Sequence, residues 1–354
     1  MMSQQAYQAG LLYNRLVKRH RHLQKWAKRC GTGAYRLYDR DIPEIPLVLD
    51  FLHNEKQIAV CGSLFERPYY KEESEEKKWL DAMLEAISGS LRVQRENIFI
   101  KLRRRQRTEG AADDQYQKAS GDAIFMDIAE NGLQFRLNLS AYIDNGLFLD
   151  LRKARSFIKE NAQNKKVLNL FCYTASFSVY AAAGGAAQID SVDMSNTYLN
   201  WGKTNFALNS NFLNIANGSY NFVRADVIRY IDDSIANKQK WDIIILDPPV
   251  FSNSKKMQGN ALNGVLDIKR DYKNLLIKCL SLLNENGFIF FSVHSRSFKF
   301  DVDDFYAQCC LGQTSTASNC NLNYPHIIIK ERAEMFRDED FKGRKIPCCY
   351  IISI

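Results

Sequence analysis

The chain has 354 residues, of which 46% are hydrophobic and 12% aromatic, and its formal net charge is +8. This length is enough for two domains, and the composition is that of an ordinary folded protein. No window approaches the roughly 18 apolar residues of a membrane helix and the N-terminus lacks a signal-peptide core, so we expect a cytoplasmic protein without a membrane partner.

The chain opens on a predicted amphipathic helix over residues 3–29. Gly31 follows it as a stop signal. Its large apolar residues recur near helical spacing at Leu12, Leu16, Leu23 and Trp26. This pattern predicts one buried face.

Positive charge is concentrated in two clusters. Residues 1–29 contain seven Lys or Arg and no acid, with Trp26 among them, and residues 101–107 hold five cations. One such cluster would be typical of a solvated surface, but two with an aromatic residue favour a nucleic-acid partner. The candidate contacts are Arg15, Arg19, Lys25, Lys101, Arg103, Arg105 and Arg107.

Short strands and one helix are predicted between residues 34 and 138. The strands cover 34–38, 47–52, 57–61, 97–102, 123–128 and 133–138, and the helix covers 73–87. Asn131-Gly132 between the last two strands is a hairpin signal, and the polar segment 108–121 is a predicted loop. We expect a small α+β domain here.

From about residue 165, strands alternate with helices. The strands are 166–171, 188–192, 220–224, 241–246 and 287–293, and the helices are 176–183, 195–209, 226–236 and 266–283. Alternation predicts parallel strands with crossover helices. Two final runs, 326–330 and 347–354, are expected to pair as a hairpin, which is typical of class I S-adenosylmethionine (SAM) methyltransferases.

Three regions are therefore expected. They are a basic N-terminal helix (1–30), a small α+β RNA-binding domain (31–145) and a Rossmann-like methyltransferase domain with a mostly parallel seven-stranded sheet (146–354). The nine cysteines show no Cys-x-x-Cys spacing, and two pairs are adjacent, which suits neither zinc nor an unstrained disulfide. We expect reduced thiols and no metal.

Acidic residues follow three successive strands of the predicted sheet. Asp193 ends the second strand, Asp226 follows the third and Asp247 ends the fourth. The carboxyl ends of parallel strands meet at one edge of a sheet, where ligands bind. Asp193 could accept ribose hydroxyls, Asp226 could meet an adenine amino group, and Asp247 could face a reacting methyl group. Met194 would pack on adenine or fill a gap in the core.

The fourth strand runs directly into Asp247-Pro248-Pro249. Two prolines can continue neither a strand nor a helix interior, so they force one rigid exit from the sheet. Asp-Pro is also a common turn starter. The three acids at neighbouring strand ends nevertheless favour a catalytic site at Asp247, Pro248 and Pro249.

The loop after the first strand lacks the Gly-x-Gly-x-x-Gly pattern of a pyrophosphate site. This absence favours SAM over a dinucleotide. The amides and hydroxyls of the loop could bind the carboxylate of the methionine moiety at the helix N-terminus. The loop supplies the candidates Asn169, Tyr173, Thr174, Ala175 and Ser176.

Several stretches carry a family resemblance. They are Tyr-Arg-Leu-Tyr-Asp (35–39), Asp-Asn-Gly-Leu-Phe-Leu-Asp-Leu-Arg (144–152), Leu-Asn-Leu-Phe-Cys-Tyr-Thr (168–174), Val-Asp-Met-Ser-Asn-Thr-Tyr-Leu (192–199), Asp-Pro-Pro-Val-Phe-Ser-Asn-Ser-Lys-Lys-Met (247–257) and Gln-Tyr-Gln-Lys (115–118). Together they resemble the guanine-N7 methyltransferase half (RlmK) of the bifunctional bacterial 23S rRNA methyltransferases (RlmKL). The resemblance spans nearly the whole chain, from about residue 13 to 354.

The resemblance implies a SAM site and an rRNA substrate. The implied SAM contacts are Phe148, Asp150, Arg152, Tyr173, Thr174, Asp193, Asp226 and Asp247. The implied partner is 23S rRNA or a pre-ribosomal particle, together with a separate guanine-N2 methyltransferase, because that half is absent from this chain. Two departures stand out: Ala175 replaces the usual glycine, and Ser292-Val293-His294 departs from the usual Ser-Asn-Asn.

Guanine N7 carries a lone pair and no proton, so its methylation needs placement rather than a general base. Asp247 would orient a guanine presented or flipped by the RNA, and Phe251 would stack on it or lie in the core. Asn253, Ser254, Lys255 and Lys256 would meet the base edge and phosphates.

Four alternatives stay open. Guanine-N2 methylation is disfavoured because Val250, not an aromatic residue, follows the prolines. Cytosine-C5 methylation requires a cysteine nucleophile, which neither 247–257 nor 292–296 contains. The other two are a small-molecule methyltransferase and a non-catalytic RNA-binding protein with a degenerate SAM fold.

Overall fold

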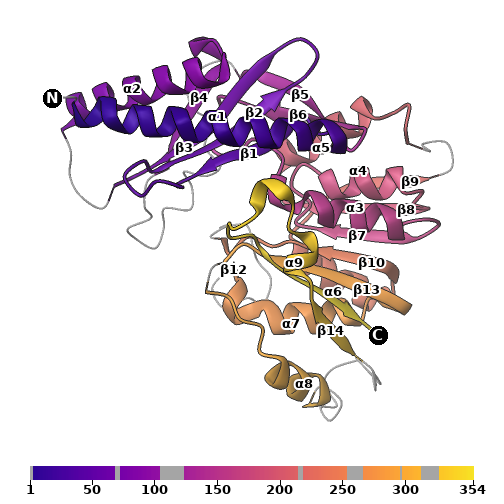
Figure 1. The fold of residues 1–354 in the computed structure, drawn as a ribbon. Coiled ribbons are helices and arrows are strands. Elements are labelled where there is room, and N and C mark those ends of the chain that lie inside the picture. Colours follow the sequence, from indigo (N-terminus) through magenta and orange to yellow (C-terminus); the bar gives the residue numbers. More distant parts are fainter. Residues whose placement is uncertain are drawn as a thin grey trace. The chain divides into compact units, whose positions relative to one another are not determined.

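The computed structural model describes residues 3–67, 72–103, 123–213, 218–252, 266–295, 297–311 and 327–354 (Figure 1). It divides into two compact units, one of residues 1–149 and 338–344 and the other of residues 150–337 and 345–354. The N-terminal helix, expected as a separate region, lies within the first unit, and the segment 338–344, expected in the methyltransferase domain, also joins that unit. No described helix is both long and apolar enough to cross a membrane.

The first unit packs two helices on a four-stranded sheet. Helices α1 (Gln4–Cys30) and α2 (Glu73–Leu91) share one buried core with strands β1 (Ala34–Asp39), β2 (Leu47–His53) and β3 (Ile58–Phe65). These strands are antiparallel, and β4 (Ile98–Arg103) pairs parallel to β3 after the short helix η1 (Arg95–Asn97). The predicted strands and helices of this unit are thus found, with ends moved by up to four residues.

Local signals set the ends of α1 and of the hairpin in this unit. The Ser3 hydroxyl accepts the amide N–H of Ala6 at the start of α1, and Gly31 ends it at φ 61°, the left-handed region that glycine tolerates. Strands β5 (Phe125–Glu130) and β6 (Leu133–Asn138) form the predicted antiparallel hairpin. Asn131 and Gly132 both have positive φ, as a tight hairpin turn requires.

The second unit is built on a seven-stranded sheet in the order β14-β15-β13-β10-β7-β8-β9. The strands β7 (Lys166–Leu170), β8 (Gln188–Asp193), β9 (Ser219–Arg224), β10 (Trp241–Leu246) and β13 (Leu283–Val293) are parallel. Strand β15 (Cys348–Ser353) is antiparallel to β13 and to β14 (Ile328–Glu331). This is the expected class I methyltransferase sheet with its terminal hairpin.

Crossover helices join these strands, as the alternation predicted. They are α4 (Ser176–Ala183), α5 (Asn196–Leu208), α6 (Val227–Ala236) and α7 (Ile268–Leu280), and the unit also contains η3 (Leu149–Leu151), which begins one residue before it, α3 (Arg152–Asn161), α8 (Val302–Leu311) and α9 (Ala333–Phe336). The short helix η5 (Glu339–Phe341) lies in the first unit.

The predicted helix 266–283 is shorter in the structure. Leu266 and Asp267 form strand β12, which pairs with β11 (Phe251–Ser252). The Asp267 carboxylate accepts the amide N–H of Lys269, so it caps α7 and fixes its first turn. Strand β13 begins at Leu283, four residues earlier than expected, because Gly287 lies within the strand rather than before it.

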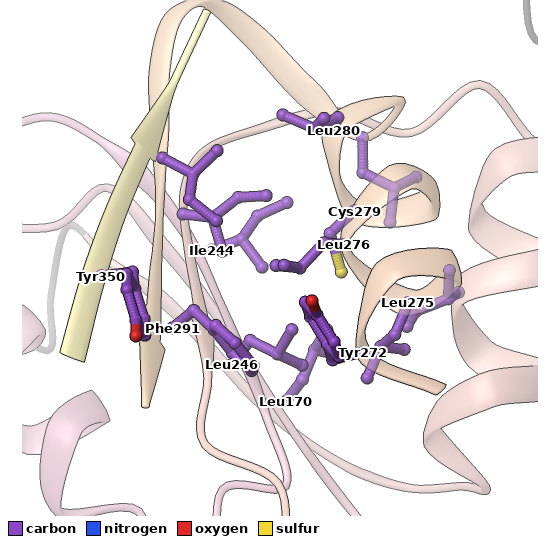
Figure 2. Close-up of a cluster of buried hydrophobic side chains, with 14 of the residues drawn as sticks. Leu170, Ile244, Leu246, Tyr272, Leu275, Leu276, Cys279, Leu280, Phe291 and Tyr350 are labelled. Carbon is purple, nitrogen blue, oxygen red and sulfur yellow. The ribbon is translucent and has the colours of Figure 1, made fainter. Parts of the chain in front are cut away.

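The core between the central strands and α7 supports the end of β10. Figure 2 shows Leu246, the last residue of this strand, beside Phe291 of β13 and Tyr272 of α7. The rings of Tyr272 and Phe291 are stacked with centroids 6.3 Å apart. Asp247 therefore follows a strand whose last side chain is fully buried, which fixes where the carboxylate leaves the sheet.

Candidate functional site at the carboxyl edge of the sheet

The three acids occupy the strand ends where the sequence placed them, but their hydrogen bonds differ. Asp193 ends β8, and both carboxylate oxygens accept backbone amides: Oδ2 from Tyr173 at 3.0 Å and Oδ1 from Ser195 at 2.9 Å. Burial raises the pKa of Asp193, and these amide bonds oppose that rise. Asp193 thus ties the first loop to the end of β8.

Asp226 is the N-cap residue of α6. Its Oδ1 accepts the amide N–H of Ile228 at 2.9 Å and of Arg229 at 3.4 Å. The second oxygen, Oδ2, is buried and has no hydrogen-bond partner among the described residues. A buried carboxylate oxygen without a donor is costly, so this atom is a candidate for a ligand contact.

Asp247 lies against the neighbouring strand β13. The Ser292 hydroxyl donates to Oδ1 at 2.5 Å, and Nε2 of His294 lies 3.6 Å from the same oxygen. The Asp247 side chain is 14% exposed and that of His294 is 30% exposed. Burial raises the pKa of Asp247, while His294 and the Ser292 hydrogen bond lower it.

More charged groups act on this carboxylate. The negative charge of Asp150 adds to the rise in the pKa of Asp247, and the guanidinium of Arg155 opposes it. Arg155 is fully buried, with its guanidinium carbon 5.8 Å from the centroid of the Tyr180 ring. Arg152, one turn earlier on α3, is also buried. The effect of Arg155 on the pKa of Asp247 places this part of α3 near the carboxylate.

A cysteine also lies close to this carboxylate. Cys349 is the cross-strand neighbour of Ser292, although it is 102 residues from Asp247 in the sequence. Its thiol is buried and its Sγ donates to the carbonyl of Pro347. Burial raises the pKa of Cys349 well above its ordinary value, and the negative charge of Asp247 adds to this rise. A buried neutral thiol is a poor nucleophile.

The loop between β7 and α4 has an unusual backbone. Phe171, Tyr173 and Ala175 all have φ between 50° and 56°, which costs energy for residues other than glycine. A β-carbon at Gly202 of α5 would lie 2.9 Å from the β-carbon of Ala175, so glycine at position 202 makes room for it. Such strain is concentrated at functional sites, and α4 begins here without a side-chain cap.

Two of the other cofactor-binding candidates from this loop, Asn169 and Thr174, have buried side chains. Asn169 is buried and its amide donates to the Ser178 hydroxyl at 2.8 Å, so this side chain belongs to the core rather than to an open site. Thr174 is also fully buried, and its carbonyl accepts from Asn205. Tyr173 is partly exposed, with its ring edge-on to Tyr198 at a centroid distance of 4.6 Å.

The remaining cofactor candidates lie at the ends of elements. Ser176 is the first residue of α4, and partly exposed Met194 follows β8, with its carbonyl accepting from Arg224. Asp150 lies at the start of the second unit, whereas Phe148 belongs to the first unit.

Two of the three predicted nucleic-acid contacts on α1 are already engaged within the first unit. Arg15 donates to the carboxylate of Asp41 at 2.7 Å, and Arg19 is partly buried and donates to the carbonyl of Asp340 at 3.3 Å. Both arginines hold the first unit together. Trp26 is 6% exposed and lies in the core, so it is not an aromatic contact for a base. Lys25, in contrast, is exposed.

The described cations of the second cluster are also engaged inside the first unit. Lys101 donates to the side chain of Asn145 at 2.5 Å, and Arg103 donates to Asp144 at 2.5 Å and to the Ser63 hydroxyl at 3.1 Å. Burial lowers the pKa of Lys101. These two side chains bind Asp144 and Asn145 and are only partly exposed.

Several predicted contacts lie outside the described residues: Arg105, Arg107, Asn253, Ser254, Lys255 and Lys256. The family motif at 115–118 also lies outside them. Pro248 and Pro249 continue from β10 as expected, and Val250 packs against the core of the second unit. Phe251, which could have been a core residue, is 41% exposed.

Sequence reasoning missed Ser292 and Arg155 as neighbours of Asp247. The register of the sheet would have found Ser292: Leu246 pairs with Phe291, so the next residues on both strands are adjacent. The signal for Arg155 is weaker, since only its spacing from Asp150 and Arg152 places it on the same short stretch of chain.

Comparison with known proteins identifies the family. A family model described as S-adenosylmethionine-dependent methyltransferase matches residues 48–301. Ribosomal RNA large subunit methyltransferase K of Neisseria meningitidis serogroup B is 39% identical over 341 residues, which cover 96% of this chain and 86% of that protein. Ribosomal RNA large subunit methyltransferase K/L of Shewanella amazonensis is 41% identical over 82% of this chain, but the chain spans only 38% of its length.

Solved structures agree on the fold. A proposed SAM-dependent methyltransferase from Streptococcus mutans covers 98% of this chain with a TM-score of 0.68 and 23% identity, and 81% of that chain is matched. A proposed methyltransferase complexed with S-adenosylhomocysteine gives a TM-score of 0.67 with 24% identity, over 98% of this chain and 82% of that chain. The chain therefore belongs to the SAM-dependent methyltransferases, within the family of ribosomal RNA large subunit methyltransferase K.

Proposed function

We propose that this enzyme transfers a methyl group from SAM to N7 of a guanine in 23S rRNA. The observation that carries the proposal is Asp247, a largely buried carboxylate held by Ser292 at the end of a central strand. The names of its relatives support a ribosomal RNA substrate.

The strand-end acids fit the nucleoside part of SAM. The unpartnered Oδ2 of Asp226 would accept the amino group of adenine, which would remove the cost of leaving that atom without a donor. Asp193 retains lone pairs beside its two amide bonds and would accept the ribose hydroxyls. Met194 would pack against adenine.

The first loop fits the methionine part of SAM. The amides of Cys172, Tyr173 and Ala175 already have acceptors within the protein. The anion-binding groups are therefore the free N–H groups at the start of α4, beginning at Ser176, where no side chain caps the helix. A helix N-terminus favours a carboxylate through both hydrogen bonding and its dipole. Bound here, SAM supplies an electrophilic methyl group to the edge of the sheet.

The groups around Asp247 suit the orientation of a base. Asp247 would hold the guanine and balance the positive charge that develops on its ring, while His294 would contact the base or a neighbouring phosphate. Exposed Phe251 is available to stack on a flipped base. No proton has to leave N7, so placement supplies the acceleration.

Two rival reactions fit the site less well. Cytosine-C5 methylation needs a thiolate, and the cysteine near Asp247, Cys349, is buried with a raised pKa. Guanine-N2 methylation typically places an aromatic ring directly after the prolines, whereas Val250 packs against the core.

The test is methyl transfer to 23S rRNA, followed by mapping of the modified nucleotide. We expect Asp247→Ala to abolish transfer while bulk RNA binding persists. Asp190→Asn is the matched control, because Asp190 is also a buried acid of this sheet but serves Trp241 and Asn221 in the core. Retained turnover in Asp247→Ala, or a wild-type product other than 7-methylguanosine, would overturn the proposal, as would absence of SAM binding in calorimetry.

A further inference from the structure

The solvent face of α1 carries a continuous row of cations, which we call the basic stripe. Its members are Lys18, Arg21, Lys25, Lys28 and Arg29. All five are exposed, and none forms an ion pair with any residue in the described stretches of the chain. Unpaired cations in a row repel one another, so such a row is unfavourable unless an anion covers it.

Helical geometry places these side chains on one face. At about 100° per residue, the five positions fall within roughly 100° of arc and span about 16 Å along the axis. Leu16, Leu23 and Ala27 point to the opposite side and are buried in the core of the first unit. The stripe is therefore the outer face of a rigid helix whose inner face is fixed.

The stripe is suited to phosphates rather than to bases. Proteins that hold single-stranded RNA place aromatic rings among their cations, so that bases stack on them. Between residues 18 and 29 the only aromatic side chain besides histidine is Trp26, and it is buried. A straight row of cations without a stacking ring matches the phosphates of a double helix, which is read through its backbone and shape.

A membrane surface is the main rival partner for a basic helix. Amphipathic helices that lie on membranes insert a free apolar face below the lipid headgroups. The apolar face of α1 is already buried against β1, β2 and α2. The helix therefore offers a membrane only charge, whereas RNA requires nothing more.

We propose that the basic stripe docks the enzyme on the phosphate backbone of double-helical rRNA, independently of base sequence. This inference rests on the proposed rRNA substrate and identifies which surface holds it. Arg15 and Arg19, on the flank of the same helix, do not contribute because their guanidinium groups are bound inside the unit.

The experiment compares two triple variants of equal charge in the full-length chain. Lys18, Lys25 and Lys28 are changed together to Gln, and the matched control changes Lys56, Lys77 and Lys78, which are exposed lysines of the same unit outside the stripe. Binding to a duplex RNA of arbitrary sequence, about 20 base pairs long, is measured as a function of salt concentration.

The stripe variant should bind on the order of 100-fold more weakly at 0.1 M salt, and its log–log salt slope should fall by about 2 to 3, since each lost phosphate contact removes about 0.7–0.9. The control should match the wild type. Equal losses in both variants would overturn the proposal, because net charge alone would then explain binding. Loss of binding only to vesicles that contain phosphatidylserine would overturn it in favour of a membrane.

Two further measurements separate this inference from the proposed function. SAM affinity by calorimetry should be unchanged in the stripe variant, because the acids of the sheet edge lie in the other unit. If the wild type fails to methylate 23S rRNA but the stripe variant still loses duplex binding, the substrate assignment is wrong and the RNA surface stands. If the wild type methylates 23S rRNA but the stripe variant binds duplex RNA as the wild type does, the proposed function stands and the basic stripe is not the RNA surface.

Discussion

Charged side chains are held in opposite ways in two regions of this enzyme. At the carboxyl edge of the second unit, Asp193, Asp226 and Asp247 are buried or half-buried, and each carboxylate accepts at least one hydrogen bond from the protein. On α1, the basic stripe is exposed and makes no ion pair with the described residues.

This difference determines which amino-acid substitutions should have large effects. A buried carboxylate makes a small number of contacts, each of them strong and directional. One substitution therefore removes a defined interaction. An exposed cation contributes a weak interaction that salt screens, so only combined substitutions should be conspicuous.

Asp226 should give the largest effect on SAM affinity outside the catalytic position. Asp226→Ser retains an N-cap for α6 but removes the second oxygen. A charge-assisted hydrogen bond is worth about 1.5–3 kcal/mol, so SAM affinity in calorimetry should fall about 10–100-fold. Asp267→Ser, the same exchange at the N-cap of α7, is the control and should bind SAM as the wild type does. Equal affinities in the two variants would exclude Asp226 as a contact.

Asp247 should make folding stability depend on pH. Burial raises its folded-state pKa above the unfolded value of about 3.9, so the folded protein holds more protons in the window above that value. The free energy of unfolding should therefore fall as pH rises through the folded pKa. Asp247→Asn removes this contribution.

Thermal unfolding tests this prediction. The difference in Tm between Asp247→Asn and the wild type should favour the variant above the folded pKa and shrink as the pH is lowered towards the unfolded value of about 3.9, at about 1.4 kcal/mol per unit of raised pKa. The same variant should lose methyl transfer, so stability and activity change in opposite directions. A difference in Tm that does not vary with pH would show that this carboxylate is not desolvated in the folded protein.

The sequence predicted the sheet edge better than it predicted which cations are exposed and unpaired within the described residues. Strand ends and the two prolines are local signals, and they placed Asp193, Asp226 and Asp247 on one edge. Whether a cation is free depends instead on partners far along the chain. Arg19 meets Asp340, which is 321 residues away and which no local pattern connects to α1.

Some of this information was nevertheless available. Helical periodicity places Arg19 near the buried side of α1 and Lys18 opposite to it, at about 100° per residue. The local density of positive charge assigned Arg19 and its neighbours to one basic cluster, because it takes no account of which side of the helix each residue occupies. For Cys349 the missing step was the order of strands, because β15 is the last strand of the chain and lies next to β13.

Ala175 should have a small effect on stability, although the first loop is strained. Ala175→Gly removes the left-handed penalty of about 1–2 kcal/mol but adds backbone entropy to the unfolded chain, worth about 0.5–1 kcal/mol. The net effect in urea unfolding should lie between neutral and a gain of about 1.5 kcal/mol. Ala182→Gly, inside α4, is the control and should lose about 1 kcal/mol. Equal losses would mean that the contact of Ala175 with α5 outweighs the strain.

Two single changes on α1 should give the smallest effects, and they separate its two kinds of cation. Lys25→Gln should lower the salt slope of duplex RNA binding by about 0.7–0.9 and leave Tm unchanged, because Lys25 is exposed and forms no ion pair with the described residues. Arg15→Gln should leave the slope unchanged and cost below about 1 kcal/mol in unfolding, since its pair with Asp41 is partly exposed. If both variants changed the slope equally, all cations of α1 would contribute to RNA binding alike, through their charge and not through their position on the helix. Different slopes would show that the helix divides its cations between holding the fold and holding the RNA.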